Sequence, residues 1–374
     1  MPTALRPLQV VIRVDASYQI GSGHVMRCLT LAEGIRAKGG AVQFICRDHP
    51  GHLIEMIRTQ GFSVSVLPPP QSSVVSDGYD DWLGVTWQED LAQTAACVTR
   101  DDTTRWDWVI IDHYAIDENW EAGARKFARK VMIIDDLANR NHACDLLVDQ
   151  NLNRSALQYQ SIVPANCVLL TGTDYAMLRP EFYEARCRMA KSDANPASGL
   201  RILVALGGAD PENITLKILT SMARYESGQR WRIDVILGAQ NLHRTSIKAF
   251  ASHMKSEVSV AQGVNNMAER YAEADVAIGA PGTSSWERCV LGLPVLLVVL
   301  ADNQRENASA LAREGVGVVI AEQAEAVGSE AFDRSLIHYL TQREWMTNAA
   351  GRALTLCDGQ GVDRVLARLM LEHN

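Results

Sequence analysis

The chain has 374 residues, of which 47% are hydrophobic and 21% are charged, and its formal net charge is −8. This length predicts about two domains, and this composition is typical of a soluble globular protein. The negative charge excludes a broad basic surface for nucleic acid, and the absence of an apolar stretch of about 18 residues excludes a membrane span.

The eight cysteines are scattered along the chain and form no CxxC pair. This spacing indicates reduced thiols and argues against a structural zinc site. The N-terminal residues lead directly into an apolar run and lack the hydrophobic segment of a signal peptide. We therefore expect a cytoplasmic protein that needs no metal or other cofactor and is a monomer or a weak oligomer.

The first half of the chain alternates short apolar runs with amphipathic stretches. Strands are predicted at 9–14, 42–46, 63–67, 108–112 and 131–135, and helices at 24–38, 52–60, 117–130 and 179–190. Because the strands are apolar throughout, we expect a parallel sheet covered on both faces. Residues 68–102 interrupt the alternation, and we interpret them as a flap or insertion with a helix near 89–98.

A linker is predicted at 191–199, where small and polar residues surround a proline, and a second alternating series follows it. Its strands are predicted at 201–206, 232–237, 258–261, 276–278, 295–299 and 316–320, and its helices at 212–225, 241–251, 266–273, 283–291 and 303–314. The sequence thus predicts an α/β protein with two doubly wound, Rossmann-like domains at 1–190 and 200–374. The carboxyl ends of both sheets are expected to face an interdomain cleft.

A glycine-rich turn, Gly21-Ser22-Gly23, lies between the first predicted strand and the first predicted helix. Small residues there let backbone amides approach an anion, and a helix N-terminus adds partial positive charge. His24 directly follows the turn, and histidine is the side chain most often used as a general base. A phosphate-bearing substrate beside a general base is therefore predicted.

The second series begins with a similar turn at Gly207 and Gly208. The glycine amides could contact a phosphate or a sugar nucleotide. Alternatively, this is a plain turn in which Asp210 caps the next helix and Pro211 occupies its first turn.

A small, hydroxyl-rich segment from Gly282 to Ser285 follows the strand at 276–278. Its amides and hydroxyls could hold a pyrophosphate. Glu287 follows about one turn into the helix, where its carboxylate could accept hydrogen bonds from both ribose hydroxyls. The alternative is that Thr283 or Ser284 caps the helix and Glu287 is a first-turn acid.

Amide side chains follow the next strand at Asn303 and Gln304. They could bind sugar hydroxyls or N-acetyl groups, although capping by Asp302 or Asn303 is an equally good account. In the first domain, residues 112–114 and 135–136 end neighbouring strands at the expected cleft edge. The pair at 135–136 is not a DxD metal motif, so a catalytic metal is not expected.

Several of these motifs resemble the PseG family, the UDP-2,4-diacetamido-2,4,6-trideoxy-β-L-altropyranose hydrolases of pseudaminic acid biosynthesis. The resemblance rests on residues 15–27, 111–114, 134–140, 144–151 and 175–182. The two-domain layout is similar to the GT-B architecture of nucleotide-sugar enzymes. The resemblance covers nearly the whole chain, although the long segment at 72–104 departs from the family's compact first domain.

The resemblance implies that residues 1–190 form the sugar-binding and catalytic domain and residues 200–374 the UDP-binding domain. His24 would be the general base, Tyr114 and Asn303 would contact the sugar, Glu287 would bind the ribose, and Val264 would border the uracil. The full set of implied substrate-binding residues is Gly21, Gly23, Arg27, Tyr114, Gly207, Gly208, Val264, Gly282, Thr283, Ser284, Ser285, Glu287, Asn303 and Gln304. The implied ligands are a UDP-sugar and UDP, in a pathway that serves flagellin glycosylation or cell-surface polysaccharide.

The expected reaction is metal-independent hydrolysis of the anomeric C–O bond with inversion, in which His24 takes a proton from water. UDP is already a good leaving group, so the acid that glycosidases need is not required. A UDP-sugar-dependent glycosyltransferase of the GT-B type is the first alternative. A non-catalytic nucleotide-sugar sensor and a hydrolysing 2-epimerase are two others, and a histidine placed as a base argues against the sensor.

Overall fold

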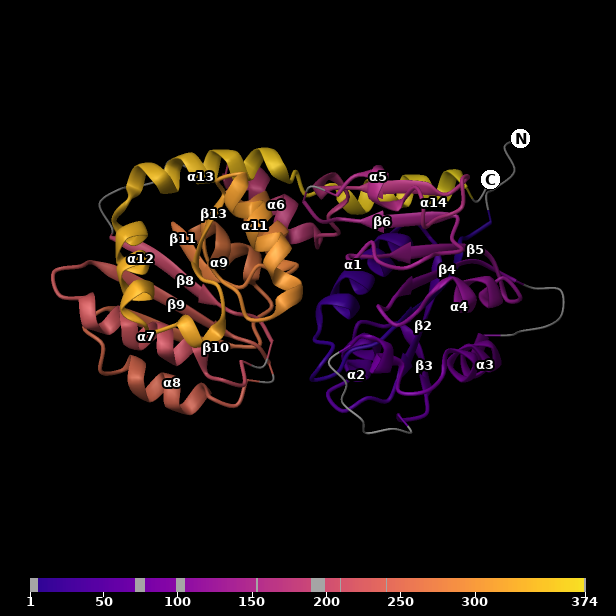
Figure 1. The fold of residues 1–374 in the computed structure, drawn as a ribbon, viewed down its shortest axis with the longest axis horizontal. Coiled ribbons are helices and arrows are strands. Elements are labelled where there is room, and N and C mark those ends of the chain that lie inside the picture. The colour runs from indigo at the N-terminus through magenta and orange to yellow at the C-terminus, as the bar shows by residue number, and fades with distance from the viewer. Residues whose placement is uncertain are drawn as a thin grey trace. The chain divides into compact units, whose positions relative to one another are not determined.

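The computed structural model describes residues 6–70, 78–98, 105–152, 154–189, 199–208, 210–239 and 241–372, without the side chains of Asp80 and Asn303. The chain divides into two compact units, which are drawn in Figure 1. Unit 1 comprises Met1–Met177 and Gln360–Asn374, and unit 2 comprises Leu178–Gly359. Within the described residues, no helix has the length and apolar character needed to cross a membrane.

The described part of unit 1 contains a seven-stranded parallel sheet in the order β3-β2-β1-β4-β5-β6-β7. The strands are β1 (Gln9–Val14), β2 (Ala41–Arg47), β3 (Ser63–Leu67), β4 (Trp106–Asp112), β5 (Ala128–Ile134), β6 (Leu146–Asp149) and β7 (Val168–Thr171). The helices are α1 (Gly23–Ala37), α2 (Ile54–Thr59), α3 (Trp87–Val98), α4 (Glu118–Ala124), α5 (Ala156–Tyr159) and α14 (Gly361–Leu371), with 3-10 turns η1 (Asp80–Leu83) and η2 (Thr173–Tyr175). The predicted doubly wound α/β fold is confirmed for this unit.

Both faces of the sheet in unit 1 are apolar, because the strands carry apolar side chains at successive positions. In β1, Val10 and Ile12 join one core with residues of α1, α2 and α14, whereas Val11 joins the other with residues of α3, α4 and α5. Successive side chains of a strand point to opposite faces, so an all-apolar strand needs helices on both sides. Because the strands are parallel, their carboxyl ends lie at one edge of the sheet, where Asp112 ends β4 and Asp136 follows β5.

The segment predicted to be a flap is part of this core. Helix α3 connects β3 to β4, and its Val98 and Leu91 pack in the same cluster as Trp120 of α4. The interpretation of 68–102 as a flap or insertion is therefore wrong for the described residues, because α3 is the crossover helix that joins two parallel strands. Residues 71–77 and 99–104 lie outside the described residues.

A buried charge cluster ties α3 to the sheet. Asp90 of α3 is fully buried and accepts hydrogen bonds from Arg13 (Nε 3.1 Å, Nη2 2.7 Å), from Arg47 (Nη2 2.7 Å) and from the Trp120 indole (3.0 Å). Arg13 also donates to Asp15 at 2.7 Å. Buried charges of this kind are stable only when they are paired, so these contacts determine how α3 sits on β1 and β2.

The free energy of unfolding is expected to fall as the pH drops below about 4. Burial alone raises the pKa of Asp15 and Asp90, but attraction by Arg13 outweighs burial and holds both pKa values below their usual range. Each carboxylate therefore stabilises the fold above its unfolded pKa and loses this contribution as the pH falls toward its lower folded pKa. Melting temperatures measured from about pH 7 to about pH 2 test this, and an unchanged melting temperature would contradict it.

Unit 2 contains a six-stranded parallel sheet in the order β10-β9-β8-β11-β12-β13, counted over its described residues. The strands are β8 (Leu200–Ala205), β9 (Trp231–Leu237), β10 (Glu257–Gln262), β11 (Val276–Gly279), β12 (Val295–Val298) and β13 (Gly317–Ala321). The helices are α6 (Pro180–Met189), α7 (Ile214–Tyr225), α8 (Arg244–Ala251), α9 (Met267–Glu273), α10 (Ser284–Val290), α11 (Arg305–Arg313), α12 (Glu330–Thr341) and α13 (Arg343–Leu356), with 3-10 turns η4 (Asp302–Gln304) and η5 (Ala324–Ala326). The second predicted Rossmann-like domain is thus also present.

The two units differ from the predicted domains in two ways. Helix α6, which we placed in the first domain, belongs to unit 2 and contacts α9 and α10. Helix α14, yellow in Figure 1, returns to unit 1 and packs on α1. A Cβ at position 361 would clash with the backbone carbonyl of Ala176, which explains a glycine at the start of α14. Of the predicted linker at 191–199, residues 191–198 lie outside the described residues.

Two element predictions in unit 1 also need correction. The helix expected at 117–130 ends at Ala124, and β5 already begins at Ala128. The short strand β7 was not predicted at all. Residues 125–130 are mostly charged and β7 has only four residues, so neither segment has a hydrophobic period that distinguishes a strand from a helix.

Candidate functional site

The turn between β1 and α1 places His24 in the first turn of a helix. Gly21 has a φ of 80°, and Gly23 is the first residue of α1. The hydroxyl of Ser17 accepts a hydrogen bond from the backbone N–H of Ile20 at 2.9 Å and closes the turn. A positive φ is costly for a residue with a Cβ, so glycine suits position 21. The predicted helix start at this motif is confirmed.

His24 pairs with a buried carboxylate at the carboxyl end of β4. Its Nδ1 lies 2.6 Å from Oδ1 of Asp112, and both side chains are buried. An ionised carboxylate can only accept, so the proton of the neutral imidazole lies on Nδ1. The lone pair is then on Nε2, as in a general base that a carboxylate orients.

Arg27, one turn after His24 on α1, keeps Asp112 charged. Its Nε lies 2.6 Å from Oδ2 of Asp112 and its Nη2 lies 2.7 Å from Oδ1. Burial alone raises the pKa of Asp112, but Arg27 and then His24 outweigh burial and hold this pKa well below its usual range. Asp112 is therefore an ionised acceptor at neutral pH.

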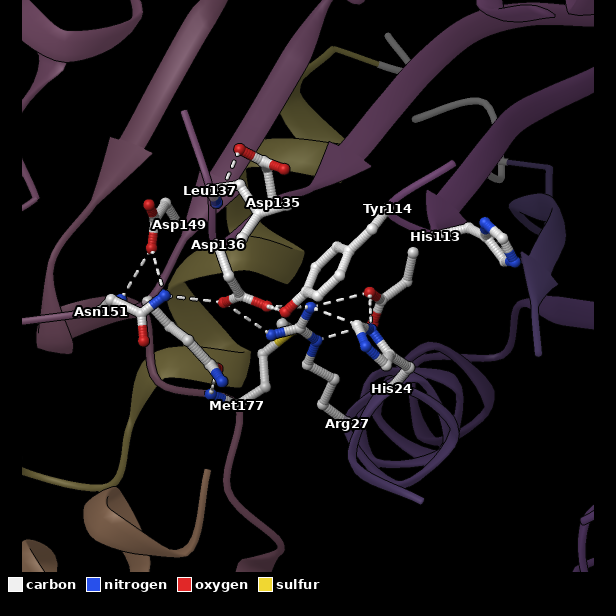
Figure 2. Close-up of polar contacts among 12 residues, drawn as sticks. His24, Arg27, His113, Tyr114, Asp135, Asp136, Leu137, Asp149, Asn151 and Met177 are labelled. Carbon is white, nitrogen blue, oxygen red and sulfur yellow. Dashed lines mark hydrogen bonds and ion pairs between the residues drawn. The ribbon is translucent and has the colours of Figure 1, made fainter. Parts of the chain in front are cut away.

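The same guanidinium reaches Asp136, which follows β5. The Arg27 Nη1 and Nη2 atoms lie 2.9 and 2.7 Å from the two oxygens of Asp136, which also accepts from the Tyr114 hydroxyl (2.7 Å) and from Asn151 Nδ2 (2.7 Å). Figure 2 shows these side chains converging from α1 and the strand ends. Because Arg27 is 3% exposed and is engaged by two carboxylates, we interpret it as a residue that positions the site. The direct substrate contact expected for Arg27 from the sequence stays a prediction.

Aromatic rings surround the imidazole. The Tyr114 ring packs edge-on against His24 with centroids 4.6 Å apart, and Trp82 stacks on Tyr114 at 5.4 Å. Tyr79 packs edge-on against both rings, at 4.9 Å from Trp82 and 5.0 Å from Tyr114. Tyr79 and Trp82 come from the segment predicted to be a flap. Their rings shelter the histidine from water on this side, which strengthens its interaction with Asp112.

Sequence reasoning found part of this cluster. It identified His24, and it noted the polar strand ends at Asp112 and Asp136 without assigning partners to them. Their position after two neighbouring parallel strands was the available signal. It missed Trp82, because no local pattern indicates that a residue 58 positions after His24 in the sequence (82 − 24) packs beside it.

In unit 2, the hydroxyl-rich segment forms the predicted start of a helix. Thr283 is the N-cap of α10, and its side chain makes no capping hydrogen bond. The turn is closed by the backbone, since the N–H of Ser285 donates to the carbonyl of Gly282 at 2.9 Å. The alternative in which the Thr283 hydroxyl caps the helix is therefore not observed.

Glu287 lies one turn into α10 and is half-buried. Burial raises its pKa, and Arg179, whose Nη2 lies 3.6 Å from Oε1 of Glu287, opposes that increase. Arg179 is shared with Glu181, to which its Nη1 lies closer, at 2.8 Å. Glu287 therefore keeps acceptor capacity for a further hydrogen-bonding group.

The glycine turn after β8 fits the capping alternative, and the expected phosphate contact of its amides stays a prediction. Gly207 and Gly208 have φ values of 78° and 22°. The Asp210 carboxylate accepts hydrogen bonds from the backbone N–H groups of Ile214 (2.7 Å) and Thr215 (3.0 Å), as the capping alternative predicts. Helix α7 begins at Ile214, so the placement of Pro211 in the first helical turn is wrong. Ala209 lies outside the described residues.

Three other predicted contacts are in unit 2. Val264 is half-buried in the loop after β10. Gln304 uses Oε1 to accept from the backbone N–H of Leu300 at 3.0 Å, so only part of its amide is available to a ligand. The side chain of Asn303 lies outside the described residues. Among the side chains that the structure describes, no group of three or more His, Cys, Asp or Glu residues could hold a metal ion.

Comparison with known proteins agrees with this fold. Residues 202–341 match the family model of the glycosyltransferase family 28 C-terminal domain. MurG of Acinetobacter baumannii has a TM-score of 0.69 at 17% identity, covering 98% of this chain and 100% of that one. The fold is GT-B. The interdomain cleft expected from the sequence stays a prediction.

Two curated relatives share too little sequence identity with this chain to assign it a specific activity. The chain is 24% identical over 312 residues to the UDP-2,4-diacetamido-2,4,6-trideoxy-β-L-altropyranose hydrolase of Campylobacter jejuni, covering 83% of this chain and 98% of the hydrolase. It is 25% identical over 303 residues to an uncharacterised protein of Methanocaldococcus jannaschii, covering 80% of this chain but only 57% of that relative. Together these matches support a nucleotide-sugar-related enzyme of the GT-B fold with a family-28-like second domain.

Proposed function

We propose that this protein hydrolyses the anomeric C–O bond of UDP-2,4-diacetamido-2,4,6-trideoxy-β-L-altropyranose, or of a closely similar UDP-sugar, to give UDP and the free sugar. The observation that carries the proposal is the pairing of His24 with Asp112 at 2.6 Å, which leaves Nε2 as a base. The 24% identity to the Campylobacter hydrolase, over almost its whole length, supports the choice of substrate.

In the proposed reaction, Nε2 of His24 takes a proton from water while the water oxygen bonds to C1 of the sugar. The C1–O bond to the diphosphate breaks, its electron pair leaves with UDP, and C1 inverts. Asp112 stabilises the imidazolium that forms, and Arg27 keeps Asp112 ionised. The proton on His24 then passes to solvent.

The remaining roles are those expected from the sequence. Unit 1 supplies Gly21, Gly23 and Tyr114 on the side of the sugar, and unit 2 supplies the nucleotide contacts. The proposed nucleotide and sugar contacts in unit 2 are Gly207, Gly208, Val264, Gly282, Thr283, Ser284, Ser285, Glu287, Asn303 and Gln304. Hydroxyls and amides of the turn at 282–285 would offset the charge that develops on the leaving diphosphate.

The test is NMR of the purified protein with this UDP-sugar in H₂¹⁸O, with EDTA present and no added acceptor. Free UDP and free sugar should form, the sugar should appear first as the inverted anomer, and no ¹⁸O should enter the β-phosphate of UDP. Label in the β-phosphate would show P–O cleavage and overturn the proposed bond. A free sugar changed at C2 would indicate a hydrolysing 2-epimerase.

A glycosyltransferase is the second candidate, because residues 202–341 match a glycosyltransferase domain. In that case an acceptor hydroxyl takes the place of water beside His24. If the UDP-sugar stays intact in the same experiment and is consumed only after an acceptor is added, transfer replaces hydrolysis as the function.

A further inference from the structure

Arg288 is a buried cation beneath the turn at 279–285 of unit 2. Its side chain is almost completely buried, with 1% of the residue exposed. Its Nη2 donates to the carbonyl of Ala280 at 2.8 Å and to the hydroxyl of Ser285 at 3.1 Å, and its Nη1 donates to the hydroxyl of Ser284 at 3.1 Å. All three acceptors are neutral.

Within the described part of the chain, no carboxylate forms an ion pair with Arg288, and its Nε has no hydrogen-bond partner. The neighbouring Glu287 instead faces Arg179. A buried charge normally has an opposite charge in contact with it, because removal from water is costly. The other large buried arginines, Arg13 and Arg47, follow this rule through Asp90. The Glu287 carboxylate acts on Arg288 electrostatically, but among the described residues no carboxylate forms an ion pair with this buried guanidinium.

Arg288 fixes the hydrogen-bonding direction of two serine hydroxyls. A hydroxyl has one proton to donate and two lone pairs that accept. Since Arg288 donates to Oγ of both Ser284 and Ser285, part of their acceptor capacity is used and their protons remain available. Each hydroxyl is thereby left with its proton free to donate to a further acceptor.

Gly279, at the end of β11, makes room for this arrangement. A Cβ at position 279 would lie 3.0 Å from Nη1 of Arg288 and 2.8 Å from the carbonyl of Ala205. A side chain at this position would meet the backbone of β8 first and the guanidinium next. The glycine is thus explained by close packing against both.

We propose that Arg288 is a positioning residue for the diphosphate of the nucleotide, an inference that rests on the proposed use of the turn at 282–285. It orients the hydroxyls of Ser284 and Ser285 as donors to phosphate oxygens, and its buried charge is offset by the diphosphate when the ligand binds. The ligand that this site would recognise is a nucleoside diphosphate. Arg288 is expected to raise its affinity through the phosphates and not through the nucleoside.

The test compares UDP with uridine, using isothermal titration calorimetry for UDP and NMR titration for uridine on the full chain. Arg288→Met should weaken UDP binding by roughly 10-fold or more while leaving uridine affinity within about twofold, since charged hydrogen bonds are stronger than neutral ones. Arg288→Lys should restore part of the UDP affinity. Arg334→Met, at an exposed arginine of α12, is the matched control and should change neither ligand.

A second measurement separates positioning from a merely structural role. If Arg288 acts through the serines, the losses in UDP affinity caused by Arg288→Met and by Ser284→Ala with Ser285→Ala should be non-additive. Equal loss of UDP and uridine affinity, or unchanged UDP affinity in a folded Arg288→Met variant, overturns the inference. Wild-type protein that binds UDP without hydrolysing the sugar nucleotide defeats only the proposed hydrolysis, and wild-type protein that does not bind UDP defeats both.

Discussion

Replacing His24 with alanine is expected to lower kcat for hydrolysis of the UDP-sugar by about 10²–10⁴-fold. The substitution removes the proposed base but leaves its neighbours paired, because Asp112 keeps both of its contacts with Arg27 at 2.6 and 2.7 Å. UDP affinity and melting temperature should therefore stay close to those of the wild type. The measurements are kcat by ³¹P NMR, calorimetry with UDP and thermal unfolding.

His253→Ala is the matched control for this prediction, since His253 is exposed in unit 2 and should leave kcat unchanged. For the wild type, kcat should also fall on acidification, because a protonated imidazole cannot accept the proton of water. Equal turnover by His24→Ala and wild type would leave the reaction standing but remove His24 as its base. A large drop in melting temperature would point to a structural role.

Asp90→Ala is expected to destabilise the protein by about 3–5 kcal/mol, the typical cost of leaving buried charges without their partner. Asp90 is fully buried and pairs with Arg13 and Arg47, whose side chains are also fully buried. Without Asp90, Arg47 loses the carboxylate that is hydrogen-bonded to its Nη2. Arg13 then keeps one carboxylate partner, Asp15. The Trp120 indole also loses its acceptor.

Urea unfolding followed by circular dichroism measures this loss, as a lower midpoint of the transition. Gln88→Ala is the matched control on the same helix, because Gln88 is exposed and its removal should cost less than about 0.5 kcal/mol. Equal midpoints for Asp90→Ala and wild type would show that α3 does not contribute to the core and would restore the interpretation of this segment as a flap.

Much of the fold could be predicted from the order of apolar and amphipathic segments. Strands apolar on both faces, alternating with helices, require a parallel sheet with helices on each side. The bounds of β1 and β3 were predicted to the residue. The errors arose where a segment had no distinctive period, as between α4 and β5, or where packing decided its role, as for α3.

The candidate site also has a part that the sequence predicts and a part that it does not. The glycine turn and His24 are local features, since a strand, a tight turn and a helix start follow one another in the chain. The partners of His24 are not local: Asp112 lies 88 positions away, and Asp136 lies 109 positions from Arg27. No pattern along the chain pairs one of several strand-end aspartates with a particular histidine.

By itself, the sequence determined that this protein has two α/β domains and a histidine at a glycine-rich turn before a helix, because hydrophobic period and turn chemistry act between near neighbours. Only the tertiary structure decided that Asp112 orients this histidine, that Trp82 and Tyr114 shelter it, and that Arg288 lies beneath the serines of unit 2. These contacts depend on strand order and on which groups are removed from water together. Both are properties of the folded chain, since burial makes the pairing of each charge obligatory.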